Sequence, residues 1–165
     1  MSSFRVALVF LCLVLGACGF QPVYGNAQKS LAQNPGIEIG DMPNRDGQYF
    51  RNILVDRLQP HGVPQNARYF LKLSAPEKSI FNIGIRRDAT ATRGQMQIAS
   101  KMQLIEKSSG QVVLERNLKS AGSYNLLDNQ LATMVSQQNL TESLLREISD
   151  DAVIELNLYL GRNTP

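Results

Sequence analysis

The spacing of apolar residues changes along the chain and predicts an order of strands and helices. Ile37-Glu38-Ile39 alternates apolar and polar positions, which predicts a short first strand closed by Gly40. The stretch Asn-Arg-Asp-Gly at 44–47 has the composition of a turn. Apolar residues then recur at helical spacing up to Pro60, which predicts a helix with one apolar stripe: Tyr49, Phe50, Ile53, Leu54 and Leu58.

A β region is predicted next. Alternation over 69–73 resumes over 81–85 after an interruption at Pro76, so this stretch should be an edge strand or contain a bend. We expect its apolar residues to keep one parity, and so one face: Tyr69, Leu71, Leu73, Phe81, Ile83 and Ile85.

Two long alternating stretches around the turn at 108–110 predict a β-hairpin, preceded by a polar loop over 86–94. One face of the hairpin is apolar, with Met96, Ile98, Met102, Leu104, Val112, Leu114 and Leu118, although Val113 breaks the alternation. The other face is polar and should meet water or a polar partner: Gln97, Lys101, Gln103, Glu115 and Lys119.

The C-terminal part predicts a second helix. Residues 125–138 have no clear pattern, whereas Asn139 followed by Glu142 resembles a capping box that starts a helix. An apolar stripe runs from Leu144 to Tyr159, and Gly161 should end the helix. Ile154 and Leu158 lie outside this stripe, so they either pack under residues 125–138 or form a surface for a partner.

These elements predict an α+β fold in the order β-α-β-β-β-α. Strands that share one apolar face, together with two amphipathic helices, favour a two-layer sandwich of a mixed sheet with both helices packed on one face. Residues 36–165 should form this single domain.

The N-terminus has the three-part layout of a secretory signal. A short segment with Arg5 precedes a ten-residue apolar run, which is too short to span a bilayer. Leu15-Gly16-Ala17-Cys18 resembles the lipobox of bacterial lipoproteins, which implies a signal peptide over 1–17 and an acylated Cys18. Several acyl chains anchor far more firmly than one. Residues 18–35 should be the lipidated N-terminus and a tether, and Gly19 in place of Asp favours the outer membrane.

Composition narrows the function further. Removing 17 residues leaves 148, with no cysteine except Cys18. The 17 basic and 14 acidic residues give too weak an excess for a nucleic-acid partner, which would need a clustered basic surface.

The chain also has few residues in arrangements suited to catalysis or metal binding, so we expect neither an enzyme nor a cofactor or metal. His61 follows the first helix in a turn and has no second histidine beside it. Asp150 and Asp151 are neighbours on a helix and point apart. Glu106 and Glu115 are expected to pair with Lys107 or Arg116. Arg86, Arg87, Arg93 and Lys101 are candidates for contact with anionic headgroups, since guanidinium groups bind phosphate in a bidentate manner.

Two stretches carry a resemblance to a known family. The segment CGFQPVYG, residues 18–25, and the segment from Ser120 to Leu160 resemble the lipopolysaccharide-assembly lipoprotein family, the LptE-type component of the outer-membrane translocon. The resemblance implies a lipid-anchored protein on the periplasmic face of the outer membrane. Such a protein plugs the β-barrel lipopolysaccharide translocon, helps it to assemble, and assists insertion of lipopolysaccharide at the cell surface.

Two other functions remain open at this point. An auxiliary lipoprotein of a periplasmic lipid-transport system would have the same anchor but a partner at the inner membrane or in the periplasm. An envelope hydrolase would need a convergent acid, base or nucleophile, for which His61 is the only histidine available.

Overall fold

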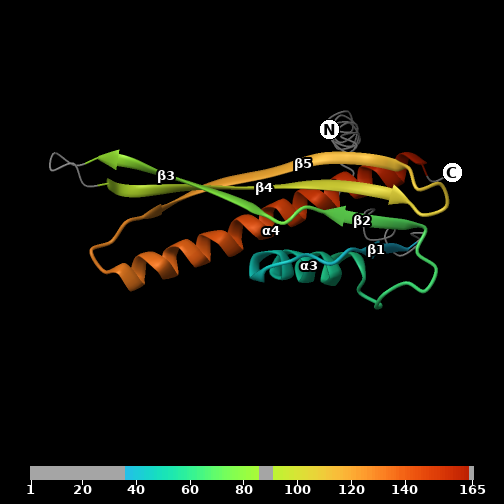
Figure 1. Ribbon diagram of the computed structural model, residues 1–165, viewed down its shortest axis with the longest axis horizontal. Coiled ribbons are helices and arrows are strands. Elements are labelled where there is room, and N and C mark those ends of the chain that lie inside the picture. The colour runs from blue at the N-terminus through green and yellow to red at the C-terminus, as the bar shows by residue number, and fades with distance from the viewer. Residues whose placement is uncertain (1–35, 86–90, 164–165) are drawn as a thin grey trace, which may run out of the picture.

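Strand β4 (Ala91–Glu106) organises the sheet, because every other described strand except β1 pairs with it. On one side β5 (Val112–Asn125) runs antiparallel along almost its whole length. On the other side β2 (Tyr69–Leu73) and β3 (Glu77–Ile85) lie end to end. Strand β1 (Ile37–Ile39) adds to β2 in parallel. Figure 1 shows this computed structural model, which describes residues 36–85 and 91–163.

Helices α3 (Arg45–Leu58) and α4 (Gln130–Asn163) lie on the same side of the sheet (Figure 1). The predicted α+β class, with a mixed sheet and two helices on one face, is confirmed for the described residues. The predicted turn at 44–47 instead lies at the start of α3, where Asn44 precedes the first helical residue at a φ of 67°.

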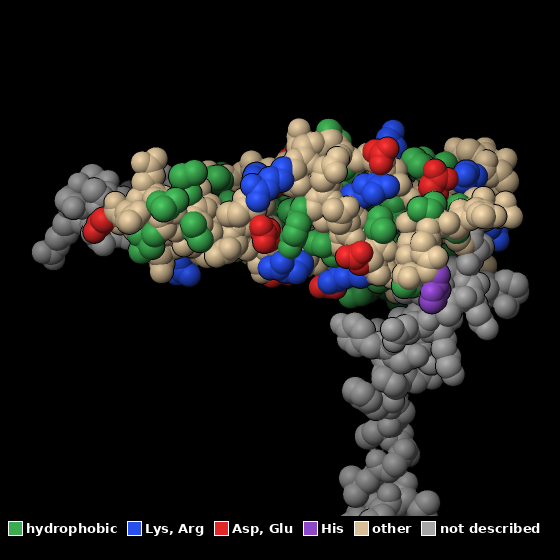
Figure 2. Space-filling model, turned by 90° about the horizontal axis from the view of Figure 1, so that it is seen from below, with side chains coloured by type: hydrophobic (Ala, Val, Ile, Leu, Met, Phe, Trp, Pro, Cys, Tyr) green, Lys and Arg blue, Asp and Glu red, His purple; other side chains and the backbone are tan. Residues whose placement is uncertain are grey.

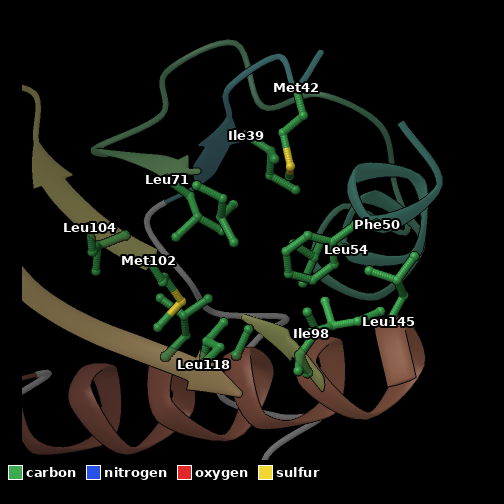
Figure 3. Close-up of a cluster of buried hydrophobic side chains, with 14 of the residues drawn as sticks. Ile39, Met42, Phe50, Leu54, Leu71, Ile98, Met102, Leu104, Leu118 and Leu145 are labelled. Atoms are coloured by element: carbon green, nitrogen blue, oxygen red, sulfur yellow. The ribbon is translucent and has the colours of Figure 1, made fainter. Parts of the chain in front are cut away.

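The core lies between the inner face of the sheet and both helices. Figure 3 shows Phe50 and Leu54 of α3 and Leu145 of α4 pointing toward sheet residues such as Leu71 and Met102. These five side chains are completely buried. Burying side chains of this size contributes about 1.5–3 kcal/mol each relative to exposure, so this cluster is the main source of stability.

The stretch 69–85 is two strands, so the predicted order lacks one strand. Between the pairs Leu73–Met102 and Glu77–Ala99, the β2–β3 side advances four residues while β4 advances three. The extra residue is held by Ser74, whose N–H donates to the Lys101 carbonyl at 2.9 Å and whose hydroxyl accepts from the Lys101 N–H at 2.9 Å.

This extra residue reverses the faces of β3. A shift of one residue turns every following side chain to the other side of a sheet. Phe81 and Ile83 therefore stand opposite Gln95 and Arg93 on the outer face, where they are exposed. The prediction that they would continue the inner face was wrong.

The β4–β5 hairpin is confirmed, with two local corrections. Residues 91–94 belong to β4 and not to the loop predicted over 86–94. Leu104 pairs with Leu114 but Ile105 pairs with Val112, so the skipped residue, Val113, packs against the core and Val112 is exposed.

Helix α4 begins ten residues earlier than predicted. The Asn129 side-chain oxygen accepts from the N–H groups of Leu131 at 2.9 Å and Ala132 at 3.2 Å, which is the geometry of a helix N-cap. Asn139 lies inside the helix. The helix also continues past Gly161, where a Cβ would meet nothing within 4 Å, and ends at Asn163.

The described molecule is elongated and has two parts (Figure 1). We call residues 36–78, 101–119 and 142–163 the body, which contains β1, β2, α3 and the second half of α4. We call residues 79–85, 91–100 and 120–141 the arm, in which residues 79–85 of β3 pair with β4, and the far ends of β4 and β5 pack on the first half of α4.

Candidate partner-binding surfaces

The outer face of the sheet is polar over the body, as predicted. Lys101, Glu115 and Lys119 are exposed there and Gln103 is partly exposed, and Gln97, on the same face of the arm, is also partly exposed. The Lys101 ammonium lies 2.8 Å from one oxygen of Glu115, and the Gln103 amide donates to the other at 2.6 Å. Both hydrogen bonds lower the pKa of the Glu115 carboxyl, and the bond from Lys101 has the larger effect. The charge of Lys101 is therefore already balanced.

The predicted headgroup-binding residues do not form one described cluster. Arg93 is exposed on the outer face of the arm, beside Ile83 and Asn125. Lys101 lies on the same face eight residues further along β4, about 26 Å away at the rise of a strand. Arg86 and Arg87, like Cys18, lie outside the described residues. The site assignment for all five residues remains a prediction.

A cleft of about 380 Å³ separates β5 from the second half of α4. It is lined by Arg116, Asn117, Leu118, Lys119, Asp151, Ile154 and Glu155. Arg116 spans it and meets Glu155 at 2.8 Å. The cleft is thus crossed by an ion pair that ties the strand to the helix.

Ile154 and Leu158 are exposed, at 38% and 50% of their surface. The expected packing under residues 125–138 does not occur, because residues 130–138 form the beginning of the same continuous helix. The other account, a surface for a partner, remains a prediction.

Glu106 does not pair with Lys107 or Arg116 as predicted, and Asp150 has a partner that the sequence did not predict. Glu106 pairs with Arg68 at 3.0 Å, and Asp150 pairs with Arg57. The hydrogen bond from Arg68 is the main reason that the pKa of Glu106 is lowered. Burial raises the pKa of Tyr159, whose ring packs edge-on against Tyr69 at 6.4 Å.

His61 lies in the turn after α3, as predicted, and is exposed. Within residues 36–85 and 91–163, no group of three His, Cys, Asp or Glu side chains could hold a metal ion. None of the described helices combines the length and the apolar composition needed to cross a bilayer.

The sequence reasoning missed exposed apolar residues on the arm. Figure 2 shows hydrophobic side chains gathered at one end of the molecule, whereas most Lys, Arg, Asp and Glu side chains lie over the rest of that view. The most exposed large apolar residues of the arm are Leu131 (70%), Met134 (57%), Phe81 (53%), Val135 (52%), Ile80 (50%) and Leu127 (50%).

The model of the lipopolysaccharide-assembly family, LptE, matches residues 30–159. This chain belongs to that family. The match includes almost all of the C-terminal segment that carries the resemblance and begins after residues 18–25. Membership shows involvement in lipopolysaccharide assembly and supports an association with the outer membrane. The comparison with curated proteins found no match.

Solved structures with the same fold come from several bacteria. A protein from Caulobacter crescentus CB15 described as a lipoprotein is 24% identical, with a TM-score of 0.62 over 85% of this chain and 98% of its own. Rare lipoprotein B from Shewanella oneidensis is 14% identical, with a TM-score of 0.56 over 74% of this chain and 96% of its own. The minor lipoprotein from Acinetobacter baumannii is 15% identical, with a TM-score of 0.54 over 75% and 93%. At these identities the likeness concerns the fold.

Proposed function

We propose that this protein plugs the β-barrel lipopolysaccharide translocon of the outer membrane, helps that barrel to assemble, and assists insertion of lipopolysaccharide at the cell surface. Acyl chains on Cys18 anchor it at the periplasmic face, and residues 18–35 tether the domain of residues 36–165. The family match over residues 30–159 is the observation that carries this proposal.

Two features of the described surface support the proposal. Apart from Phe81 and Ile83 in the arm, the outer face of the sheet is largely polar, and none of the described helices packs on it. The lumen of an outer-membrane barrel is itself polar, so such a face can lie against it without burying unpaired apolar groups. The elongated shape would also place one end of the molecule deep in a pore while the other stays near the anchor.

The test is purification of the full-length protein from detergent-solubilised outer membrane. We expect a large β-barrel in a one-to-one complex, and mass spectrometry of the mature N-terminus should show an acylated Cys18. Recovery of an inner-membrane or periplasmic partner without a barrel would replace this function with that of an auxiliary lipid-transport lipoprotein.

Direct contact with lipopolysaccharide is tested separately. We expect the triple variant Arg86→Ala, Arg87→Ala, Arg93→Ala to bind purified lipopolysaccharide more weakly, because it loses three groups suited to bidentate phosphate contact. Lys101→Ala is the comparison, because Lys101 is paired with Glu115 and should contribute less. Equal binding by the wild type and the triple variant would remove the arginines from the proposal.

A further inference from the structure

Charged residues are scarce in the arm. Its described segments contain Arg93 and Asp128 as their only charged residues, although 19% of the chain is charged. Every ion pair found among the described residues joins two residues of the body. The polar surface of the arm consists instead of uncharged side chains such as Gln95, Ser123 and Gln130.

The arm also exposes apolar side chains on two separate sides. Phe81 and Ile83 stand on the outer face of the sheet. Leu131, Met134 and Val135 form a stripe on α4, because residues spaced i, i+3 and i+4 are neighbours on a helix. Helix α4 lies on the opposite side of the sheet from Phe81 and Ile83. The surface of an arm surrounded by water would be expected to carry charges of both signs in place of such residues.

The stripe on α4 continues a surface that the body buries. Leu145 is fourteen residues after Leu131, close to four helical turns, so both project from nearly the same side of α4. In the body α3 covers this side, and Leu145 is fully buried near Phe50 and Leu54 (Figure 3). None of the described elements covers it in the arm, where Leu131 is 70% exposed.

We propose that the arm is the part of the molecule that the wall of the barrel encloses, with the Leu131–Val135 stripe and the Phe81–Ile83 pair as its two apolar contacts. This rests on the proposed function and specifies which surface performs it. Charged residues are depleted at the centre of protein interfaces, where apolar residues such as Met and Phe are common. The exposed surface of the arm likewise has few charges, and Met134 and Phe81 are among its apolar residues. The barrel wall takes, along the first half of α4, the place that α3 takes along the second half.

A protein wall fits these observations better than the other occupants. A lipid headgroup would need basic partners, and Arg93 is the only basic residue of the described arm. A second copy related by a two-fold axis would cover one patch, whereas the exposed residues lie on two sides of the arm.

The position of the tether agrees with this orientation. Residue 36 adjoins β1, which pairs with β2, and β2 in turn pairs with residues 102–106 of β4. The arm residues of β3, 79–85, pair with the other end of β4, residues 91–97. The arm therefore points away from the end at which the proposed lipid anchor joins the domain.

The test places a photo-crosslinking amino acid at Leu131, at Phe81 or at Val63 of the full-length protein in the outer membrane. Val63 is the matched control, because it is 69% exposed but belongs to the body. We expect crosslinks to the barrel from 131 and 81 and none from 63. Crosslinks only to lipid, only to a second copy, or to the barrel from 63 alone would overturn the proposal.

Charge insertion gives a second measurement. Leu131→Glu and Phe81→Glu should lower recovery of the barrel at least about tenfold, since each would bury an unpaired charge in the contact, and Val63→Glu should not. All three sites are exposed, so thermal unfolding should show folded variants. Wild-type protein without a barrel would refute the proposed function itself, whereas a barrel recovered equally by all variants would refute only the role of the arm.

Discussion

The body and the arm share β4, β5 and α4, yet their solvent-exposed surfaces differ in composition. In the body, α3 and the sheet cover the side of α4 that contains Leu145, and ion pairs such as Lys107–Glu38 and Arg116–Glu155 join separate elements at the surface. In the arm, one side of α4 packs on the sheet and the remaining surface carries exposed apolar and uncharged polar residues. One side of α4 is therefore buried in the core of the body, whereas nearly the same side is exposed to solvent in the arm.

The arm nevertheless has its own internal contacts. Tyr124 lies over Gly94, where an added Cβ would come within 2.3 Å of the ring, and its hydroxyl accepts from the Gln137 amide at 2.7 Å. Thr141 donates to its own helix at the Gln137 carbonyl and also approaches the sulfur of Met96 at 3.3 Å. The first half of α4 is thus held to the sheet on one side, so the openness of its other side is not due to a lack of packing.

The largest expected effect comes from truncating one leucine in each half of α4, Leu145 in the body and Leu131 in the arm. Leu145→Ala should lower the free energy of unfolding by about 2–5 kcal/mol, because it leaves a cavity in the core. Leu131→Ala should change it by no more than about 0.5 kcal/mol, as for an exposed site. Chemical denaturation of both purified variants measures the difference, and similar losses would mean that the stripe at Leu131 is buried in the free protein.

A smaller effect tests the packing of the arm. Gly94→Ala should cost about 1–3 kcal/mol of folding free energy, because the new methyl group meets the Tyr124 ring. Gly161→Ala is the matched control, since nothing lies within 4 Å there and alanine favours a helix by about 1 kcal/mol. Thermal unfolding compares the two, and a neutral Gly94→Ala would show that Tyr124 does not lie over this glycine.

The start of α4 can be tested directly, because the structure places the helix cap at Asn129 whereas the sequence predicted it at Asn139. Asn129→Ala should cost about 1 kcal/mol through the loss of a helix cap, whereas Asn139→Ala should have little effect inside the helix. Denaturation gives the energies, and circular dichroism reports any fraying of the first turns. If Asn139→Ala cost more than Asn129→Ala, the capping box predicted from the sequence would be the true start.

The error in the predicted start of α4 has a physical cause. Leu131, Met134 and Val135 form only a short apolar group, and the four polar residues at 136–139 separate it from the long stripe that starts at Leu144, so the periodicity does not extend back to the start of α4. Where one stripe dominates, as in α3 or in the second half of α4, the periodicity identified the helix and its largest buried residues, among them Phe50, Leu54 and Leu145.

The candidate surfaces were harder to predict than the fold, because strand register decides them. Alternation identified the polar outer face around Lys101 and Glu115, but one extra residue near Ser74 turned Phe81 outward, which alternation alone does not reveal. Pairing Glu115 with Arg116 failed because adjacent residues of a strand point to opposite faces, and the cross-strand neighbour Lys101 is its partner instead.

The smallest predicted effect concerns acid, which should act on the body more than on the arm. Glu106 and Glu115 both lie in the body, and their pKa values are lowered by Arg68 and Lys101 respectively. A carboxyl whose folded pKa lies below its unfolded value, about 4.3 for Glu, stabilises the fold above that value and loses this contribution as the pH falls through the folded pKa. The melting temperature should therefore fall as the pH drops below about 4.3, and it should fall less in the double variant Glu106→Gln, Glu115→Gln. Both ion pairs are exposed, so the difference between the two proteins should be small. An identical pH dependence would mean that neither pair contributes to stability, and the body would then depend on its apolar core alone.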